Sequence, residues 1–235
     1  MTLFKIPHHI GACISDGFPI FLDVEGDNYL SLPKEATPLL IDLINKREID
    51  INDLACDDSI NRQQFAIIQM LLRNGLATGE PIGNNEMWIH KVDLPKNDIL
   101  IADPTSLKTT NYDLIGTLAK SYFRSLLDNS FYNMYLVLQR LYKYRPRHKK
   151  SVDHDLINII CNFRRIRPLF YTASDRCYFD CLVLMYFLKS LGLKPTWVFA
   201  VSMPKFQAHC WVQIDDTVVT DSLTTTNLYT PILAL

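Results

Sequence analysis

A thiol, an imidazole and a carboxylate follow one another in the last quarter of the chain. They are Cys181, His209 and Asp221, separated by 28 and 12 residues. A cysteine is a strong nucleophile only as the thiolate, and a neighbouring imidazolium or a helix N-terminus lowers its pKa. The histidine can protonate a leaving amine, while the aspartate holds the ring by its other nitrogen. These residues therefore predict acyl chemistry by a Cys-His-Asp triad.

The segments around the triad have the patterns of elements that could position it. Cys181 precedes a long apolar run, typical of a buried helix, which ends at Gly192. Residues 196–201 are predicted to form a buried strand, His209 lies on the next strand, and Asp221 ends the strand after that. Backbone N–H groups at the helix start could also stabilise a tetrahedral oxyanion.

Cys177 is a rival nucleophile, four residues before Cys181 and on the same face of a helix. The choice depends on where the helix begins. If Asp180 caps the helix, Cys181 lies in the first turn and gains the favourable dipole. If the helix begins at Ser174, Cys177 is the favoured thiol and Cys181 lies one turn inside.

Each triad residue also has a common structural role. A buried cysteine usually serves as a small apolar side chain, a strand histidine is usually a hydrogen-bonded core or surface group, and a strand-end aspartate usually caps a turn. A metal site of Cys177, Cys181, His209 and Cys210 is disfavoured, because strand neighbours face opposite ways and the spacing suits zinc poorly. We therefore expect no metal and no cofactor.

The hairpin that carries the histidine and the aspartate gives a sharper structural test. A two-residue turn at Asp215-Asp216 would place Asp221 opposite Cys210, on the face away from His209. A loop over Asp215–Thr217, or a bulge before Asp221, would bring the carboxylate to the face of the imidazole. Asp-Asp lacks the glycine that tight turns favour. The triad hypothesis therefore predicts the odd-length loop or the bulge.

The first 80 residues have the pattern of a separate small module. The predicted elements are strands 18–24 and 29–32 around the turn 25–28, a helix beginning at Thr37-Pro38 with Thr as N-cap, and a helix over Asn61–Asn74 that Gly75 ends. A hairpin with a helix pair resembles a winged helix-turn-helix, so DNA binding is the first function to test.

The charge of this module argues against DNA binding. Residues 1–80 carry six Lys/Arg and twelve Asp/Glu, a net charge of −6, whereas the rest of the chain carries eighteen and thirteen, or +5. Phosphate contacts need clustered basic residues. Recognition of a peptide suits the module better: an extended peptide could add to the strand Tyr29–Leu32 and lie against the helix Asn61–Asn74. The alternative is a plain packing subdomain.

The middle of the chain is predicted to be a linker followed by helices. Residues 81–112 hold three prolines and many turn formers, with room for one short strand. Helical patterns return from Asp113, and a further helix is predicted over Asp153–Phe163. The basic stretch Arg140–Lys150 could contact nucleic acid or an acidic partner, but such a stretch is usually a solvated helix end.

Composition places the chain among globular cytoplasmic proteins. Its residues are 48% hydrophobic and 21% charged, enough for a packed core and without the bias of disorder. No apolar run is long enough to span a membrane, and the first residues lack the features of a signal peptide. The six scattered cysteines are therefore expected to be reduced thiols.

The segment "CLVLMYFLKSLGLKPTWVFAVSMPKFQAHCWVQIDDTVVTD" resembles the lasso peptide B proteins, bacterial maturation proteases with a transglutaminase-like, papain-related fold. The shared pattern is Cys-Leu before a helix, a strand, His-x-Trp-Val, a turn and Asp. Residues 1–80 resemble the PqqD-like leader-recognition domain, through the "DGFPIFLDVEGDNYLSL" hairpin and "LLRNGL". Asp215-Asp216 departs from the commoner turn with Gly, and Gln213 stands where Glu is frequent.

The resemblance implies an α+β fold in three parts: a winged-helix-like PqqD-type domain over 1–80, a linker over 81–112, and a papain/transglutaminase-like cysteine protease domain over 113–235. Cys181 would be the nucleophile because it precedes Leu182, with His209 and Asp221 completing the triad. The residues implied in leader binding lie on the third strand and third helix of the recognition domain: Tyr29, Leu30, Ser31, Leu32, Phe65, Ile68, Gln69 and Leu72.

The implied activity is removal of the leader from a ribosomally made lasso peptide precursor. The implied partners are the precursor's leader and an asparagine-synthetase-like macrocyclase, with no nucleic acid, membrane or cofactor. Two other functions stay open: a transglutaminase-type acyl transferase, which forms the same thioester, and a non-catalytic peptide-binding maturation scaffold.

Overall fold

The computed structural model describes residues 3–46, 49–50, 60–79, 92–99, 112–145, 156–172 and 177–235. Several predicted features fall partly outside these ranges: the linker at 81–91 and 100–111, the end of the basic stretch at 146–150, the helix start at 153–155 and the possible helix start at 174. Within the described ranges, no helix combines the length and the apolar character that crossing a membrane requires.

The N-terminal part contains a three-stranded antiparallel sheet of β2 (Ile10–Ser15), β3 (Phe18–Asp23) and β4 (Asn28–Ser31), in that order. The predicted hairpin between β3 and β4 is confirmed. Its loop is closed by Asp23, whose Oδ1 accepts the N–H groups of Glu25 and Gly26 at 2.9 and 3.0 Å. Strand β2 was not predicted. The turn between β2 and β3 contains Asp16 and Gly17, and both have the positive φ that tight hairpin turns require.

Two helices cover one side of this sheet: α1 (Thr37–Lys46) and α3 (Ile60–Arg73). A 3₁₀ turn, η1 (Lys34–Ala36), precedes α1, and the Thr37 hydroxyl donates to the Gly17 carbonyl (2.7 Å) instead of capping the helix as predicted. Gly75 ends α3 with φ 69°, and the next N–H returns to the Leu71 carbonyl (2.8 Å), which satisfies a terminal carbonyl. Short strands β1 (Leu3–Phe4) and β5 (Ile49–Asp50) pair beside them.

The C-terminal part is built on a five-stranded sheet with the order β10-β7-β8-β9-β6. The strands are β6 (Asn97–Asp98), β7 (Thr196–Ser202), β8 (Gln207–Ile214), β9 (Thr217–Val218) and β10 (Thr230–Ala234), with the short helix α8 (Leu223–Thr226) after β9. The predicted strands around residues 196–201 and His209 are confirmed. The short strand within the predicted linker is β6, which pairs in parallel with β9.

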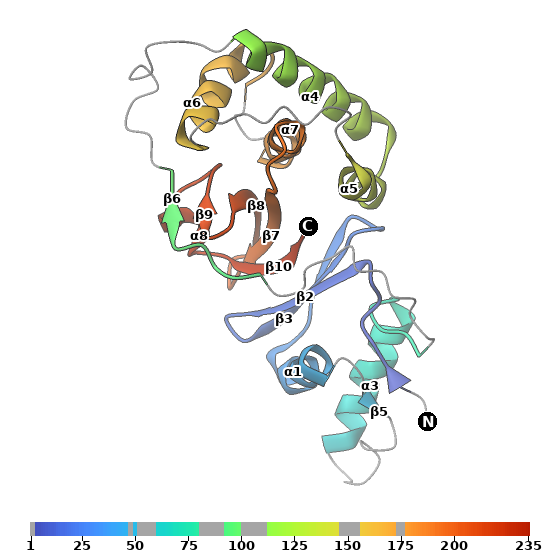
Figure 1. Cartoon of the computed structure of the whole chain (residues 1–235). Helices are drawn as coiled ribbons and strands as arrows, with labels where there is room; N and C mark the ends of the chain where they lie inside the picture. The colour runs from blue at the N-terminus through green and yellow to red at the C-terminus, as the bar shows by residue number, and fades with distance from the viewer. Residues whose placement is uncertain are drawn as a thin grey trace.

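Helix α7 (Cys177–Ser190) lies at the centre of this part, between the sheet and the helix α4 (Tyr112–Phe131) (Figure 1). Every side chain from Cys181 to Leu188 is buried, as expected for a helix that is apolar all round. Helices α5 (Met134–Lys143) and α6 (Leu156–Ile166), with the 3₁₀ turn η3 (Arg167–Leu169), complete the layer.

The N-terminal sheet packs directly against the C-terminal sheet, because β2 and β3 lie beside β10 (Figure 1). Ile20, Leu22 and Val24 of the hairpin are fully buried in the same apolar cluster as α7. Gly11 permits the approach, since a Cβ there would lie 2.8 Å from the carbonyl oxygen of Ile232. The two parts therefore share one continuous core.

Candidate active site

The imidazole of His209 and the carboxylate of Asp221 are in direct contact. Nε2 of His209 lies 2.6 Å from Oδ2 of Asp221, and both side chains are partly buried, with 19% and 24% exposed. His209 lies on β8 opposite Ala200 of β7, and its ring packs on the ring of Tyr229, with centroids 5.1 Å apart. The contact to Asp221 leaves Nδ1 as the ring nitrogen that can serve a thiol.

The turn before Asp221 has two residues, so the predicted three-residue loop does not form. Ile214 pairs with Thr217, and Asp215 takes a left-handed conformation with φ 52°. Aspartate tolerates this conformation better than most residues, which explains why the turn needs no glycine.

The regular pairing with β8 instead ends just before Asp221, which has the effect expected of the predicted bulge. Val219 still donates its N–H to the Val212 carbonyl at 2.9 Å, but the Val212 N–H donates to the Thr220 hydroxyl. The freed carbonyl of Val219 accepts from the guanidinium of Arg164 at 3.1 Å. The chain is therefore released from the register that would have placed Asp221 on the wrong face.

Two further contacts hold the segment around Asp221. Its Oδ1 accepts the N–H of Ser222 at 2.7 Å, and the next N–H, that of Leu223, is donated to Oδ2 of Asp98 at 2.7 Å. Asp98 lies on β6, in the stretch predicted to be a linker, and no local sequence pattern indicated this role. The outer strand thus helps to fix the position of the carboxylate.

The thiol that interacts with His209 is that of Cys177. Cys177 is the first residue of α7 and is exposed, and its thiol lies near enough to the His209 ring for each group to shift the pKa of the other. The first N–H groups of a helix have no partner within the helix, so the positive end of the α7 dipole lies at this thiol.

Cys181, which the sequence indicated as the nucleophile, lies one turn further into α7. Only 2% of the residue is exposed, and its thiol donates to the carbonyl of Cys210 at 3.6 Å. Burial raises its pKa, which opposes thiolate formation. The structure therefore joins His209 and Asp221 to Cys177 and leaves Cys181 in the core, which is the outcome expected for a helix that begins before Asp180.

The electrostatics of the site favour a charged histidine. The hydrogen bond to Asp221, followed by that to Cys177, raises the pKa of His209 to about 9. The bond between His209 and Asp221 also lowers the pKa of Asp221. The pKa of Cys177 is raised to about 12, first by its hydrogen bond to Cys210, although contact with His209 lowers it. The resting site therefore holds a protonated thiol beside an imidazolium.

An ion pair fixes the first turn of α7 from the other side. Oδ2 of Asp180 lies 2.9 Å from Nη1 of Arg167, and Oδ1 accepts from the Tyr171 hydroxyl at 2.7 Å. Asp180 thus lies inside the helix and anchors it to η3, instead of capping it as one prediction required. A carboxylate in the first turn also complements the helix dipole.

The residues implied in leader binding divide into two groups. Leu32 and Ile68 are buried in the core of the N-terminal part, with 4% and 3% exposed, and are not available to a peptide. Phe65 is 50% exposed. The others are exposed or half-buried: Tyr29, Leu30, Ser31, Gln69 and Leu72.

Tyr29 connects the predicted peptide-binding strand to Cys210 and Cys177 of the candidate site. Its ring packs on that of Phe206, just before β8, with centroids 5.3 Å apart. Burial raises the pKa of Tyr29, and Cys210 and Cys177 are near enough to raise it further. The edge strand β4 therefore lies close to the triad, a relation that no local sequence pattern could reveal.

Comparison with known proteins identifies the part of the chain that carries this site. Residues 130–234 match the family model of the transglutaminase-like superfamily, a range that includes Cys177, His209 and Asp221. No curated protein and no solved structure matches the chain. Residues 130–234 of this mixed α and β protein form a transglutaminase-like domain.

Proposed function

We propose that this protein is a cysteine peptidase that removes the leader from a ribosomally made peptide precursor. The nucleophile is Cys177, His209 is the acid and base, and Asp221 orients the ring. The observation that carries the proposal is the 2.6 Å contact of His209 with Asp221 beside the thiol that begins α7. The transglutaminase-like match supports thioester chemistry at this cysteine.

The geometry supports a two-step acyl transfer. In the molecules in which His209 has first lost its proton to solvent, the thiol of Cys177 gives its proton to Nδ1 of the neutral ring, and the sulfur attacks the peptide carbonyl carbon. N–H groups at the start of α7 stabilise the oxyanion. The amine leaves with the proton from His209, which forms a thioester. Water, deprotonated by His209, then attacks the thioester, releasing the acid and restoring the thiol.

The N-terminal part supports a peptide substrate held in extended form. In the described sheet β2-β3-β4, β4 is an edge strand, and an edge strand can pair with an added peptide. Tyr29 places that edge near the cysteines. A leader bound along β4 would raise the local concentration of the scissile bond at Cys177. The resemblance to lasso peptide B proteins motivates the choice of precursor and of an asparagine-synthetase-like macrocyclase as partner.

The proposal is tested with the full-length protein and a precursor encoded beside its gene. We expect wild type to release leader and core peptide, Cys177→Ala to release neither while still binding leader, and Cys181→Ala to retain activity within a few fold. Processing by Cys177→Ala at the wild-type rate would overturn the proposal. Loss of activity in Cys181→Ala alone would return the nucleophile to Cys181.

A transglutaminase-type transfer is the second candidate, because the superfamily includes both activities and the same thioester serves either. Mass spectrometry separates them when a primary amine is added with the precursor. Hydrolysis gives a new carboxylic acid, whereas transfer gives an amide that carries the added amine. A protein that binds leader but forms neither product would be a non-catalytic scaffold.

A further inference from the structure

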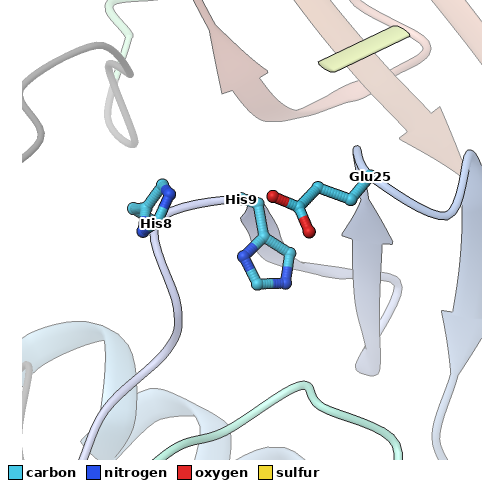
Figure 2. Close-up of side chains that lie close together, drawn as sticks. All are labelled: His8, His9 and Glu25. Atoms are coloured by element: carbon cyan, nitrogen blue, oxygen red, sulfur yellow. The ribbon is translucent and has the colours of Figure 1, made fainter. Parts of the chain in front are cut away.

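Two histidines and a glutamate converge at a place separate from the triad. His8 and His9 lie just before β2, and Glu25 lies in the loop between β3 and β4. One nitrogen of each ring and one carboxylate oxygen all lie within 4.8 Å of one another. Figure 2 shows the Glu25 carboxylate pointing toward the His9 ring, with the His8 ring nearby.

Backbone hydrogen bonds hold together the two segments that carry this cluster. The N–H of Val24 donates to the carbonyl of His9 at 3.0 Å, which fixes the residue before Glu25 to the histidine pair. The N–H of Ile10 donates to the Pro7 carbonyl at 3.0 Å and closes the turn that presents both rings. The convergence therefore follows from the pairing of β2 with β3 and not from side-chain flexibility alone.

Helix α5 orients the outer ring of the cluster. Nε2 of His8 lies 3.1 Å from the hydroxyl of Tyr135, which leaves Nδ1 as the nitrogen that can bind a ligand. The side-chain amide of Asn133 donates to the Glu25 carbonyl at 3.5 Å. A hydrogen-bond partner on the second ring nitrogen is the arrangement found around metal-bound histidines.

We propose that His8, His9 and Glu25 bind a divalent transition-metal ion of the zinc type, with Tyr135 as a positioning residue for His8. Two imidazoles and a carboxylate are ligands that such ions accept, and three protein ligands leave a position for water. Bonds of about 2.0–2.1 Å in a tetrahedral site set neighbouring ligand atoms about 3.3 Å apart. The cluster must therefore contract by at most about 1.5 Å, a shift that needs side-chain rotation at the exposed Glu25 and at the partly buried histidines.

The bound ion would tie the β3–β4 loop to the segment before β2. The same hairpin carries Tyr29 against Phe206, near the catalytic cysteines. Metal binding would therefore stabilise the hairpin that the proposed function uses to hold its substrate. The site itself does not depend on that function, because none of its ligands belongs to the triad.

The test is a titration of the metal-free, full-length protein with Zn²⁺, followed by calorimetry and thermal unfolding. We expect one equivalent to bind at this cluster and Tm to rise by roughly 5–10 °C at a hundredfold excess over Kd. His9→Gln and Glu25→Gln should lose both effects, and Tyr135→Phe should weaken binding by about 10–100-fold. Glu35→Gln, an exposed glutamate outside the cluster, is the matched control and should bind as wild type.

Zinc could also bind to the thiols of the triad region, and a second variant distinguishes this from binding at the cluster. Binding should survive in Cys177→Ala, and Co²⁺ in place of Zn²⁺ should give a spectrum without thiolate charge transfer. The Tm of each variant without metal shows whether it is folded. The proposal is overturned if wild type binds no zinc, or if binding persists in His9→Gln and disappears in Cys177→Ala.

Discussion

At the scale of single residues, the reactivity of the site is set by the two partners of Cys177. Its hydrogen bond to Cys210 keeps the thiol protonated, while its contact with His209 favours the thiolate. Cys210 is itself part of a chain of sulfurs, since its Sγ lies 3.9 Å from that of Cys181. Cys210, like His209, thus shifts the pKa of the proposed nucleophile Cys177.

We expect Cys210→Ala to shift the pH profile of Cys177 alkylation to lower pH, because the substitution removes the largest cause of the raised pKa. The measurement is the rate of iodoacetamide labelling between pH 6 and pH 10, approximately, with the labelled cysteine found by mass spectrometry. In wild type the rate should still be rising at the upper end of this range, because the pKa of Cys177 is raised to about 12. An unchanged profile in Cys210→Ala would contradict this account of the thiol.

The His209–Asp221 pair should also give a pH-dependent contribution to stability. The pKa of His209 is raised from 6.5 to about 9, so its contribution is complete below 6.5 and is lost as pH rises through 9. The pKa of Asp221 is lowered from 3.8, so its contribution is present above that value and is lost at lower pH.

The difference in Tm between wild type and Asp221→Asn should therefore be largest from about pH 4 to pH 6.5. A partly exposed pair of this kind contributes about 1 kcal/mol, or roughly 2–4 °C in a chain of this size. Thermal unfolding followed by circular dichroism measures it. A difference that grows between pH 7 and pH 9 would have the wrong sign.

At the scale of elements, the position of α7 depends on the anchor between Asp180, Arg167 and Tyr171. Asp180→Asn should destabilise the protein by roughly 1.5–3 kcal/mol, because it weakens hydrogen bonds to a charged group and leaves the Arg167 guanidinium without its anion. It should also slow catalysis, since the first turn of α7 carries Cys177. Urea unfolding and precursor processing measure the two effects.

Asp215→Asn is the matched control for that substitution. Asp215 is exposed in the two-residue turn with φ 52°, a conformation that asparagine also adopts readily. Its stability should stay within about 0.5 kcal/mol of wild type. Equal effects of the two substitutions would show that the anchor of α7 does not matter.

The element scale also shows what the sequence could and could not predict. Apolar periodicity and turn residues predicted α3, β7, β8 and the β3–β4 hairpin, because these elements follow local rules. The choice between Cys177 and Cys181 needed the position of one helix start to within a turn and the place of His209 across the sheet. The apolar run after Cys181 is buried on every side, so its pattern gives no sign of where the helix begins.

At the scale of the whole molecule, the two parts predicted from the charge asymmetry are joined by a shared core. Charge describes the surface, and it cannot show which apolar side chains of a hairpin face another sheet. Ile20, Leu22 and Val24 do so here. The predicted PqqD-type identity of residues 1–80 stays a prediction, while the packing explains how a peptide on β4 could reach the site.

Substitution of Gly11 tests the packing of β2 against β10. Gly11→Ala should destabilise the protein by roughly 1–3 kcal/mol, because the added methyl would meet the backbone of β10. Gly116→Ala is the control: Gly116 lies in α4 with open space around it, and alanine there should stabilise by roughly 0.5–1 kcal/mol. Urea unfolding measures both. Similar changes in the two variants would contradict the close approach of β2 to β10.

The central claim is that the thiol at the start of α7 forms the covalent intermediate. The most direct measurement treats the full-length protein with a chloromethyl ketone built on the leader residues that precede the cleavage site, and maps the modified cysteine by mass spectrometry. The account predicts modification of Cys177, and its loss in His209→Ala. Modification of Cys181 instead, or of no cysteine, would contradict it.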